Sequence, residues 1–325
     1  QSVLRKLLEI IVVSTAKLKV LLDCDPGHDD AFAIIVASKF AEVLGVTTVA
    51  GNAPLELTTK NARVILDLCG ASKMQLHSGA SRPLVAEPIH AAYIHGDSGM
   101  DGADFSAPSR PADGTDAVHF IIEKVRANPG VWLVPTGPLT NIALALRVAP
   151  DLVENISGIS LMGGGRFGNR TAMAEFNIWC DPEAASAVFD SGAKIVMSGL
   201  HLTHQIMATP ARIEMVRNAH SVVGPKLAGL LEFFSKMYKS LHDDFEGAPL
   251  HDVCAVLALT HPQFFESSER HVAVEIDGAI TRGMTVIDYR HVISRAKANT
   301  KVLETIDADA AFSAIVEAIR ACPER

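Results

Sequence analysis

Residues 18–31 read LKVLLDCDPGHDDA, so an apolar run stands directly before an acidic turn. The apolar residues at 18–22 predict a short buried strand. Pro26-Gly27 predicts a turn, and residues 29–41 carry apolar side chains at helical spacing. The segment therefore predicts a strand, a turn and a helix, which together form the first half of a βαβ unit.

The same alternation continues beyond this first unit. Further strands are predicted at 42–49, 74–77, 131–134, 156–162 and 194–197, with helices between them at 57–68, 115–127, 139–148 and 182–189. Strands that alternate with helices indicate parallel pairing and a doubly wound sheet. We therefore expect an α/β protein in which one mostly parallel sheet is flanked by helices.

The last third of the chain has a different pattern. A mainly helical region is expected at 210–262, late strands at 272–276 and 284–288, and a final helix at 310–321. No linker-like segment divides the chain, which favours a single large domain with a helical region near the active site. We expect this domain to span 18–325 and an N-terminal extension to occupy 1–17.

Composition and charge argue against several classes of function. The chain has 325 residues, a net charge of −8 and a hydrophobic content of 48%. Because no basic excess is present to neutralise phosphates, we expect no binding to nucleic acid. No uncharged apolar run reaches the ~18 residues of a membrane span, so no membrane association is expected. Five cysteines without a CxxC pair favour a reduced, cytoplasmic protein.

Oxygen-rich residues follow several predicted strands, and the first group of them is strongly acidic. Asp23, Asp25, Asp29 and Asp30 all lie within the eight residues 23–30. The carboxyl ends of parallel strands lie at one edge of a sheet, where ligands bind. Carboxylates gathered there repel one another unless a cation neutralises them. Since hard cations such as Ca²⁺ prefer oxygen ligands, the segment predicts a site of this kind.

The residues alone leave two alternatives open. Asp29 and Asp30 would also suit the first turn of the helix that follows them, as capping residues. Asp23 and Asp25 would also suit a Mg²⁺-dependent phosphotransferase as nucleophile and acid, although no basic partner for a phosphate stands out. Asp252 begins another predicted helix, and a cap is the simpler role for it unless it faces the first acidic group.

The order and approximate spacing of the motifs from residue 18 to about 320 resemble those of the inosine-uridine preferring nucleoside hydrolase family. The matching motifs are 23–31, 51–52, 95–99, 135–138, 162–165, 174–177, 181–185 and 251–252. The resemblance implies an α/β enzyme of nucleoside salvage that cuts the N-glycosidic bond between ribose and a nucleobase with water. It also implies a small ribonucleoside as the binding partner and assembly into a homodimer or homotetramer.

The resemblance also assigns roles to individual residues. The implied ligands of Ca²⁺ are the carboxylates of Asp25, Asp30 and Asp252 and the backbone carbonyl of Thr136. The implied substrate-binding residues are Asn52, His95, Met162, Asn169, Glu175, Phe176, Asn177 and Tyr238. Asp29 would be the general base for a calcium-bound water, and His251 would be the acid near the leaving nucleobase. This agrees with the positive oxocarbenium character of such a reaction, which nearby oxygens stabilise.

Some positions depart from the family pattern or bear on specificity. His28 is an apolar residue in some members, and we expect it to be peripheral. Phe234 stands where a second tyrosine would accompany Tyr238, so one hydroxyl near the base is lost. The segment 247–252 resembles the pyrimidine-preferring branch, so uridine and cytidine are expected to be weakly favoured over inosine. The alternative from another class is a non-catalytic ribose- or nucleoside-binding protein.

Overall fold

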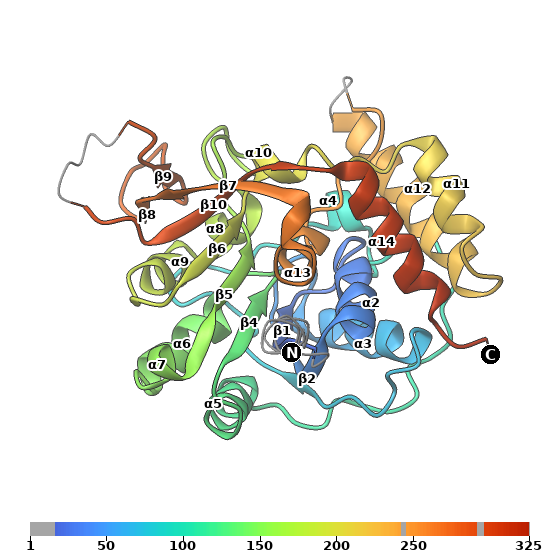
Figure 1. The fold of residues 1–325 in the computed structure, drawn as a ribbon, viewed down its shortest axis with the longest axis horizontal. Coiled ribbons are helices and arrows are strands. Elements are labelled where there is room, and N and C mark those ends of the chain that lie inside the picture. Colours follow the sequence, from blue (N-terminus) through green and yellow to red (C-terminus); the bar gives the residue numbers. More distant parts are fainter. Residues whose placement is uncertain (1–16, 242–244, 291–295, 325) are drawn as a thin grey trace, which may run out of the picture.

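The computed structural model of the chain describes residues 17–241, 245–290 and 296–324. The strands of its main sheet are β1 Lys19–Cys24, β2 Glu42–Thr48, β3 Leu76–Ser78, β4 Val131–Pro135, β5 Ile156–Met162, β6 Ile195–Ser198, β7 Phe265–Arg270 and β10 Thr300–Ile306. They lie in the order β3-β2-β1-β4-β5-β6-β10-β7 (Figure 1). All neighbours pair in parallel except β7, which runs antiparallel to β10. The expected α/β fold with one mostly parallel sheet is confirmed.

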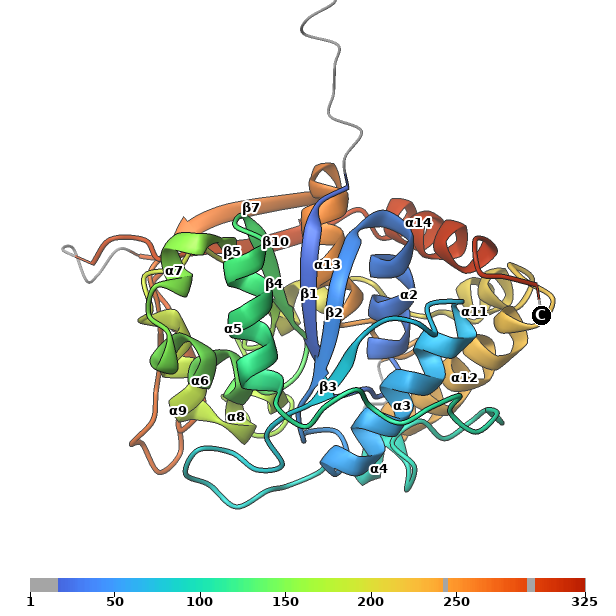
Figure 2. The same cartoon turned by 90° about the horizontal axis from the view of Figure 1, so that it is seen from below.

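Helices cover both faces of this sheet (Figures 1 and 2). One face packs against α2 Asp30–Phe40, α3 Leu55–Leu68, α13 Val253–Thr260 and α14 Ala308–Arg320, and the other against α5 Ala117–Ala127, α6 Thr140–Val148 and α9 Pro182–Phe189. After its exposed first residue, β1 is buried along its whole length. A strand covered on both faces needs a continuous apolar run, which is the pattern that residues 18–22 carry.

The order of the strands creates a crevice at one end of β1. The chain continues from β1 to β2 and β3 on one side, and then crosses back to β4, β5 and β6 on the other. The loops that follow β1 and β4 therefore diverge at the carboxyl edge of the sheet. In open α/β sheets a ligand binds where the strand order reverses in this way.

The helical region of the second half lies at this same end of the sheet. It contains α11 Pro210–Arg217 and α12 Val223–Leu241, and α12 packs against the short α4 Ala92–His95. Ile94, Phe234, Tyr238 and Ala248 form a small apolar cluster between them. The short helices α7 Leu152–Asn155, α8 Phe176–Cys180 and α10 Leu200–Thr203 and a 3₁₀ turn at Pro262–Phe264 complete the helices of the described residues. The expected helical region near the site is thus present.

The two late strands are not part of the main sheet. β8 Val272–Val274 and β9 Thr285–Ile287 form a separate antiparallel pair. The sequence patterns did not predict β10 and β7. These two strands lie beyond β6, and β7 is the edge strand on that side of the main sheet. β7 has the sequence FESSER, and its side chains are partly or fully exposed. An edge strand with exposed side chains has no apolar run by which it could be recognised.

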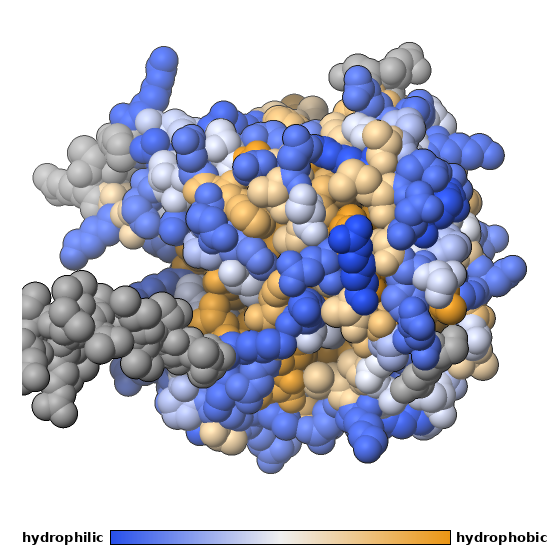
Figure 3. Space-filling view, turned by 45° about the vertical axis from the view of Figure 1, so that its right-hand side comes forward, coloured by the Kyte–Doolittle hydropathy of each residue, from blue (hydrophilic) through white to orange (hydrophobic). Residues whose placement is uncertain are grey.

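Two further expectations concern the N-terminal extension and the membrane. Residues 1–16, which make up nearly all of the expected extension, lie outside the described residues, so the boundaries 1–17 and 18–325 stay predictions. Within the described ranges, no helix combines the length and the apolar character that crossing a membrane requires. Polar residues cover much of the face drawn in Figure 3, with apolar patches between them.

Candidate active site

Three aspartates converge beyond the carboxyl end of β1. Asp29 precedes α2, Asp30 begins it, and Asp252 precedes α13. One carboxylate oxygen from each lies within 4.8 Å of those from the other two, and all three residues are buried. The side chains of Asp29 and Asp252 make no capping hydrogen bond to the helices that they precede. Helix capping therefore does not account for this cluster.

Asp25 lies next to these three carboxylates. Its Oδ2 accepts a hydrogen bond of 2.7 Å from the backbone N–H of Asn52, whereas its buried Oδ1 has no hydrogen-bond partner among the described residues. A Cβ added at Gly51 or Gly137 would collide with the Asp25 carboxylate. Glycine at these two positions lets the loops after β2 and β4 close around a carboxylate that keeps one oxygen available.

The electrostatics of the cluster favour a bound cation. Burial raises the pKa of Asp29 to about 7, and repulsion from Asp30 adds to this effect. Burial, followed by repulsion from Asp29 and Asp30, raises the pKa of Asp252 well above its ordinary range. A divalent cation would remove both penalties because it neutralises the charges and replaces lost hydration with direct ligation. The donors are all oxygens, which suits a hard cation such as Ca²⁺.

Thr136 connects the cluster to the opposite side of the crevice. Its Oγ1 donates a hydrogen bond of 2.7 Å to Oδ1 of Asp30. Its backbone carbonyl, the group implied as a metal ligand, accepts a hydrogen bond of 2.8 Å from Nδ2 of Asn177. A carbonyl oxygen has two lone pairs, so this contact leaves one of them for a cation.

Asp23, the fourth aspartate of the segment, has a structural role. Its Oδ1 accepts hydrogen bonds from Thr47 Oγ1 at 2.6 Å and from Asn141 Nδ2 at 2.8 Å, and burial raises its pKa to about 6. These contacts tie β1 to β2 and α6. Asp23 does not line the pocket described next, and that lining contains no lysine or arginine. The phosphotransferase alternative needs Asp23 as the nucleophile and a basic partner for the phosphate, and this lining contains neither.

Asp29 and Asp252 line a pocket at this edge of the sheet. Its lining consists of Asp29, Asn52, Ala91, Tyr93, Ile94, His95, Thr136, Met162, Asn169, Glu175, Phe176, Asn177, Phe234, Tyr238, His251 and Asp252. Every residue expected to act in catalysis or substrate binding lies in this lining, whereas the expected ligands Asp25 and Asp30 lie outside it. Tyr93 was missed, and its only sequence signal is an aromatic residue two positions before His95.

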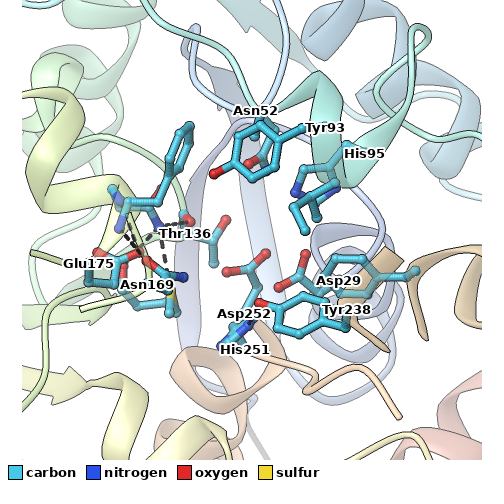
Figure 4. A pocket seen from close by; sticks show the side chains of 16 residues that line it. Asp29, Asn52, Tyr93, His95, Thr136, Asn169, Glu175, Tyr238, His251 and Asp252 are labelled. Carbon is cyan, nitrogen blue, oxygen red and sulfur yellow. Dashed lines mark hydrogen bonds between the residues drawn. The ribbon is translucent and has the colours of Figure 1, made fainter. Parts of the chain in front are cut away.

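One wall of the pocket is polar and held by backbone hydrogen bonds (Figure 4). Glu175 caps α8, because its Oε1 accepts from the N–H of Asn177 and its Oε2 from those of Ile178 and Gly164. Burial raises the pKa of Glu175 to about 7. Asn169 fixes the loop beside it, since its Oδ1 accepts from the N–H of Phe176 at 2.9 Å. This wall therefore presents rigid carboxylate and amide oxygens.

The opposite wall carries aromatic and imidazole groups, with His95, Tyr238 and His251 facing Glu175 across the carboxylates (Figure 4). His251 is buried between two hydroxyl groups: Tyr238 Oη lies 2.7 Å from its Nε2, and Thr203 Oγ1 lies 2.7 Å from its Nδ1. Burial lowers the pKa of His251 well below its ordinary range. Thr203 on α10 was not predicted, because no motif surrounds it.

His28, which we expected to be peripheral, does not line the pocket, but it is buried directly against His95, which does. Its Nδ1 lies 3.0 Å from Nδ1 of His95, and its ring stacks on that of Phe234. The sequence placed His28 in a turn, and only the folded chain brings α4, the loop that follows it and the helix α12 against it. Phe234 packs in the same cluster and lines the pocket.

Comparisons with known proteins agree with this site. The family model of the inosine-uridine preferring nucleoside hydrolases matches residues 20–313. The chain is 44% identical over 292 residues to the pyrimidine-specific ribonucleoside hydrolase RihA of Shewanella woodyi, covering 89% of this chain and 93% of that protein. It is 38% identical over 307 residues to the inosine-uridine preferring nucleoside hydrolase of Leishmania major, covering 93% of this chain and 97% of that protein.

Comparison with solved structures supports the same family. The purine-preferring ribonucleoside hydrolase from Gardnerella vaginalis superimposes with a TM-score of 0.87 at 33% identity, covering 93% of this chain and 98% of that one. The similarity thus extends over nearly the whole chain in both sequence and fold. The chain therefore belongs to the inosine-uridine preferring nucleoside hydrolase family, whose members hydrolyse N-glycosidic bonds of nucleosides.

Proposed function

We propose that this nucleoside hydrolase works with Ca²⁺ and that Asp29 is its general base. The observation that carries the proposal is the gathering of the Asp29, Asp30 and Asp252 carboxylates within 4.8 Å beside the unpaired Oδ1 of Asp25. Asp25, Asp30, Asp252 and the carbonyl of Thr136 would hold the ion. When bound, the ion would orient a water molecule and lower its pKa.

Asp29 would take the proton of that water. It lines the pocket, unlike Asp30, so its carboxylate can reach a molecule that stands between the aspartates and a substrate. General base catalysis requires a proton acceptor within hydrogen-bond reach of the attacking water. A carboxylate at the border between the acidic cluster and the open pocket meets this requirement.

The polar wall would bind the ribose. Asn52, Glu175 and Asn177 line the pocket, and backbone contacts hold Glu175 and Asn177 in place before any substrate arrives. Cleavage of an N-glycosidic bond develops positive charge on the sugar. Preorganised oxygens next to that charge stabilise the transition state, because no further reorganisation is needed at the moment of reaction.

The aromatic wall would bind the nucleobase and protonate it as it leaves. His251 and Tyr238 both line the pocket and are hydrogen-bonded to each other. A proton can therefore pass between the hydroxyl and the imidazole without movement of either side chain. A leaving nucleobase departs more readily when a proton reaches it, which makes this pair the proposed acid.

Pyrimidine ribonucleosides are the proposed preferred substrates. The pyrimidine-specific relative is 44% identical, whereas the purine-preferring structure is 33% identical. The test is a turnover screen of uridine, cytidine, inosine, adenosine and guanosine, with free base and ribose as the measured products. We expect the highest kcat/KM for uridine or cytidine. A higher value for inosine would remove the pyrimidine preference, and absence of product from all five would favour the non-catalytic binding alternative.

The remaining expectations about this protein stay predictions. They are a cytoplasmic location, a role in nucleoside salvage and assembly into a homodimer or homotetramer. Light scattering coupled to size-exclusion chromatography would measure the assembly directly. A mass close to that of the 34.7 kDa chain would contradict it.

A further inference from the structure

The short helix α10 has no role in the reaction proposed above, yet it touches both walls of the pocket. It spans Leu200–Thr203, and three of its four residues are buried. At its start it packs against the loop 163–165, which binds Glu175 of the polar wall. At its end Thr203 contacts His251 of the aromatic wall. A buried element in contact with both walls determines how they lie relative to each other.

Backbone contacts fix the start of α10 relative to Glu175. The N–H of Gly164 donates a hydrogen bond of 2.9 Å to Oε2 of Glu175, and the carbonyl oxygen of Gly164 accepts one of 2.9 Å from the N–H of Leu200. A Cβ at Gly165 would lie only 2.9 Å from the backbone nitrogen of Leu200, so glycine is needed for this close approach. The distance between the carboxylate and the helix therefore depends on backbone atoms and not on flexible side chains.

The hydroxyl of Thr203 is held at the other end of the helix. The N–H of Thr203 donates a hydrogen bond of 3.0 Å to the carbonyl oxygen of Gly199, and the threonine is fully buried. Its Oγ1 lies 2.7 Å from Nδ1 of His251, which is the only hydrogen-bond contact of this hydroxyl among the described residues. Because a hydroxyl can both donate and accept, the contact forms whichever of the two atoms supplies the hydrogen.

This contact distinguishes two orientations of the His251 ring. A rotation of 180° exchanges Nδ1 with Cδ2 and Nε2 with Cε1, and the two forms have nearly the same shape. Packing alone therefore separates them poorly, and hydrogen bonds decide between them. In the structure Nδ1 faces Thr203 and Nε2 faces Tyr238, each at 2.7 Å. In the turned ring both hydroxyls would face C–H groups, and both contacts would be lost.

We propose that Thr203 is the positioning residue for the leaving-group acid: it selects the orientation of His251 in which Nε2 faces Tyr238, and α10 fixes this ring relative to Glu175. The proposal rests on the proposed function and deepens it. A bound nucleoside reaches both walls, with its sugar at the polar wall and its base at the aromatic wall. Misplacement of a reacting group by ~1 Å can cost ~10²-fold in rate, so a rigid link between the walls favours the reaction.

Thr203→Val isolates this role, because valine keeps the shape of threonine and removes the hydroxyl. Nδ1 of the buried His251 then has no partner at residue 203. Loss of one neutral hydrogen bond changes the ratio of the two ring orientations by ~2–13-fold, which corresponds to about 0.5–1.5 kcal/mol. Only the contact with Tyr238 still opposes the turned ring. We therefore expect the turned ring to become populated in this variant.

The direct test is the orientation of the His251 ring, measured by nuclear Overhauser effects in the calcium-loaded, nucleoside-free enzyme. In Thr203→Val a methyl group takes the place of the hydroxyl. We expect a contact between this methyl group and the Cδ2–H of His251, which forms in the turned ring. A His251→Gln variant assigns the signals. A ring that keeps Nδ1 toward residue 203 in the valine variant would overturn the proposal. No turnover is needed, so this result is independent of whether the proposed function holds.

A second test varies the leaving group. We expect Thr203→Val to lower kcat for uridine by ~2–13-fold, in line with the loss of one hydrogen bond. The value for p-nitrophenyl riboside should stay near that of the wild type, because nitrophenolate leaves without a proton. Thr203→Ser keeps the hydroxyl and should restore most of kcat for uridine. Thr58→Val removes another fully buried hydroxyl, on α3, and as the matched control should leave the ratio of the two substrates unchanged.

The outcomes of this second test are distinct. Equal losses for uridine and p-nitrophenyl riboside would show that Thr203 supports the pocket as a whole and does not position the acid. An unchanged kcat for uridine in Thr203→Val, or the same loss in Thr203→Ser, would reject the role of the hydroxyl. If His251→Ala itself leaves the ratio of the substrates unchanged, the acid assignment fails, and the orientation of the ring still decides whether Thr203 holds His251.

Discussion

Tyr238 and His251 are joined directly, with the phenol oxygen of Tyr238 2.7 Å from Nε2 of His251. On its other side, Nδ1 of His251 lies 2.7 Å from the hydroxyl oxygen of Thr203. Both nitrogens of the imidazole are thus engaged, which holds the ring in one orientation. Because α12 carries Tyr238 and α10 carries Thr203, three separate segments hold the residue proposed as the acid.

The first prediction concerns leaving-group protonation. His251→Ala should lower kcat for uridine by ~10²–10⁴-fold, the range typical of general acid catalysis. The same variant should lower kcat for p-nitrophenyl riboside far less, because nitrophenolate leaves without a proton. Tyr238→Phe should reproduce this selectivity, since it removes the hydroxyl that His251 contacts. Equal losses for both substrates in a variant that is folded by circular dichroism would remove the pair from the acid role.

The second prediction concerns the general base. Asp29→Asn should lower kcat by a factor of ~10²–10⁴ for uridine and for p-nitrophenyl riboside alike, because the water must be activated whatever group leaves. KM should change little if the ribose contacts are intact. Steady-state kinetics with both substrates provides the measurement. Near wild-type kcat in this variant would assign the base to another residue.

The third prediction concerns metal removal. Chelation should abolish turnover and lower Tm, because Asp25, Asp29, Asp30 and Asp252 are left buried without a neutralising charge. A ligand present at 100 times its Kd stabilises the folded state by about 2.7 kcal/mol. We expect removal of the ion to lower the free energy of unfolding by an amount of this order. Differential scanning fluorimetry with and without added Ca²⁺ measures it, and Mg²⁺ at the same concentration is the control. Full activity in a thoroughly metal-free sample would contradict the calcium proposal.

The fourth prediction concerns the pH dependence of stability in the metal-free protein. The pKa values of Asp29 and Glu175 are both raised to about 7 in the folded chain, by burial above all. A raised carboxyl pKa means that the folded state holds protons that the unfolded state has already lost. The two carboxyl groups therefore favour the folded state fully at pH values below their unfolded pKa values, which are near 4. This contribution to stability is lost as pH rises to about 7, the pKa of both groups in the folded chain.

We accordingly expect the metal-free protein to be less stable at pH 8 than at pH 5. Urea unfolding at a series of pH values measures the free energy of unfolding directly. Added Ca²⁺ should restore part of the stability at pH 8, because the ion compensates the charge of Asp29. A free energy of unfolding that rises between pH 5 and pH 8 without metal would show that other groups dominate.

The fifth prediction concerns the sugar. Asn52, Glu175 and Asn177 are proposed to bind the ribose hydroxyls, and a site built to bind a hydroxyl rejects its absence by as much as ~10⁴-fold. The value of kcat/KM for 2′-deoxyuridine should therefore lie orders of magnitude below that for uridine. Competition between the two nucleosides in one reaction measures this ratio directly. Comparable turnover would refute the assignment of the ribose wall.

Much of the fold and of the candidate site could be predicted because the sequence patterns that indicate them are local. The apolar run at 18–22 is continuous since β1 is buried on both faces, and the acidic turn after it follows directly in the chain. Parallel strands bring the ends of β1, β2 and β4 to one edge, so polar residues that follow them could be assigned to one site. Edge strand β7 lacked such a signal because none of its side chains is fully buried, so no continuous apolar run is needed there.

The sequence by itself determined the α/β class, the family and the residues around the pocket, since these depend on local periodicity and on ordered motifs. Only the tertiary structure decided which of those residues touch. It placed Asp23 in a tether to Thr47 and Asn141, added Thr203 to His251, and brought His28 against His95 across 67 positions of the chain. Hydrogen bonds between distant segments depend on distances of a few tenths of an ångström, which no spacing along a chain encodes.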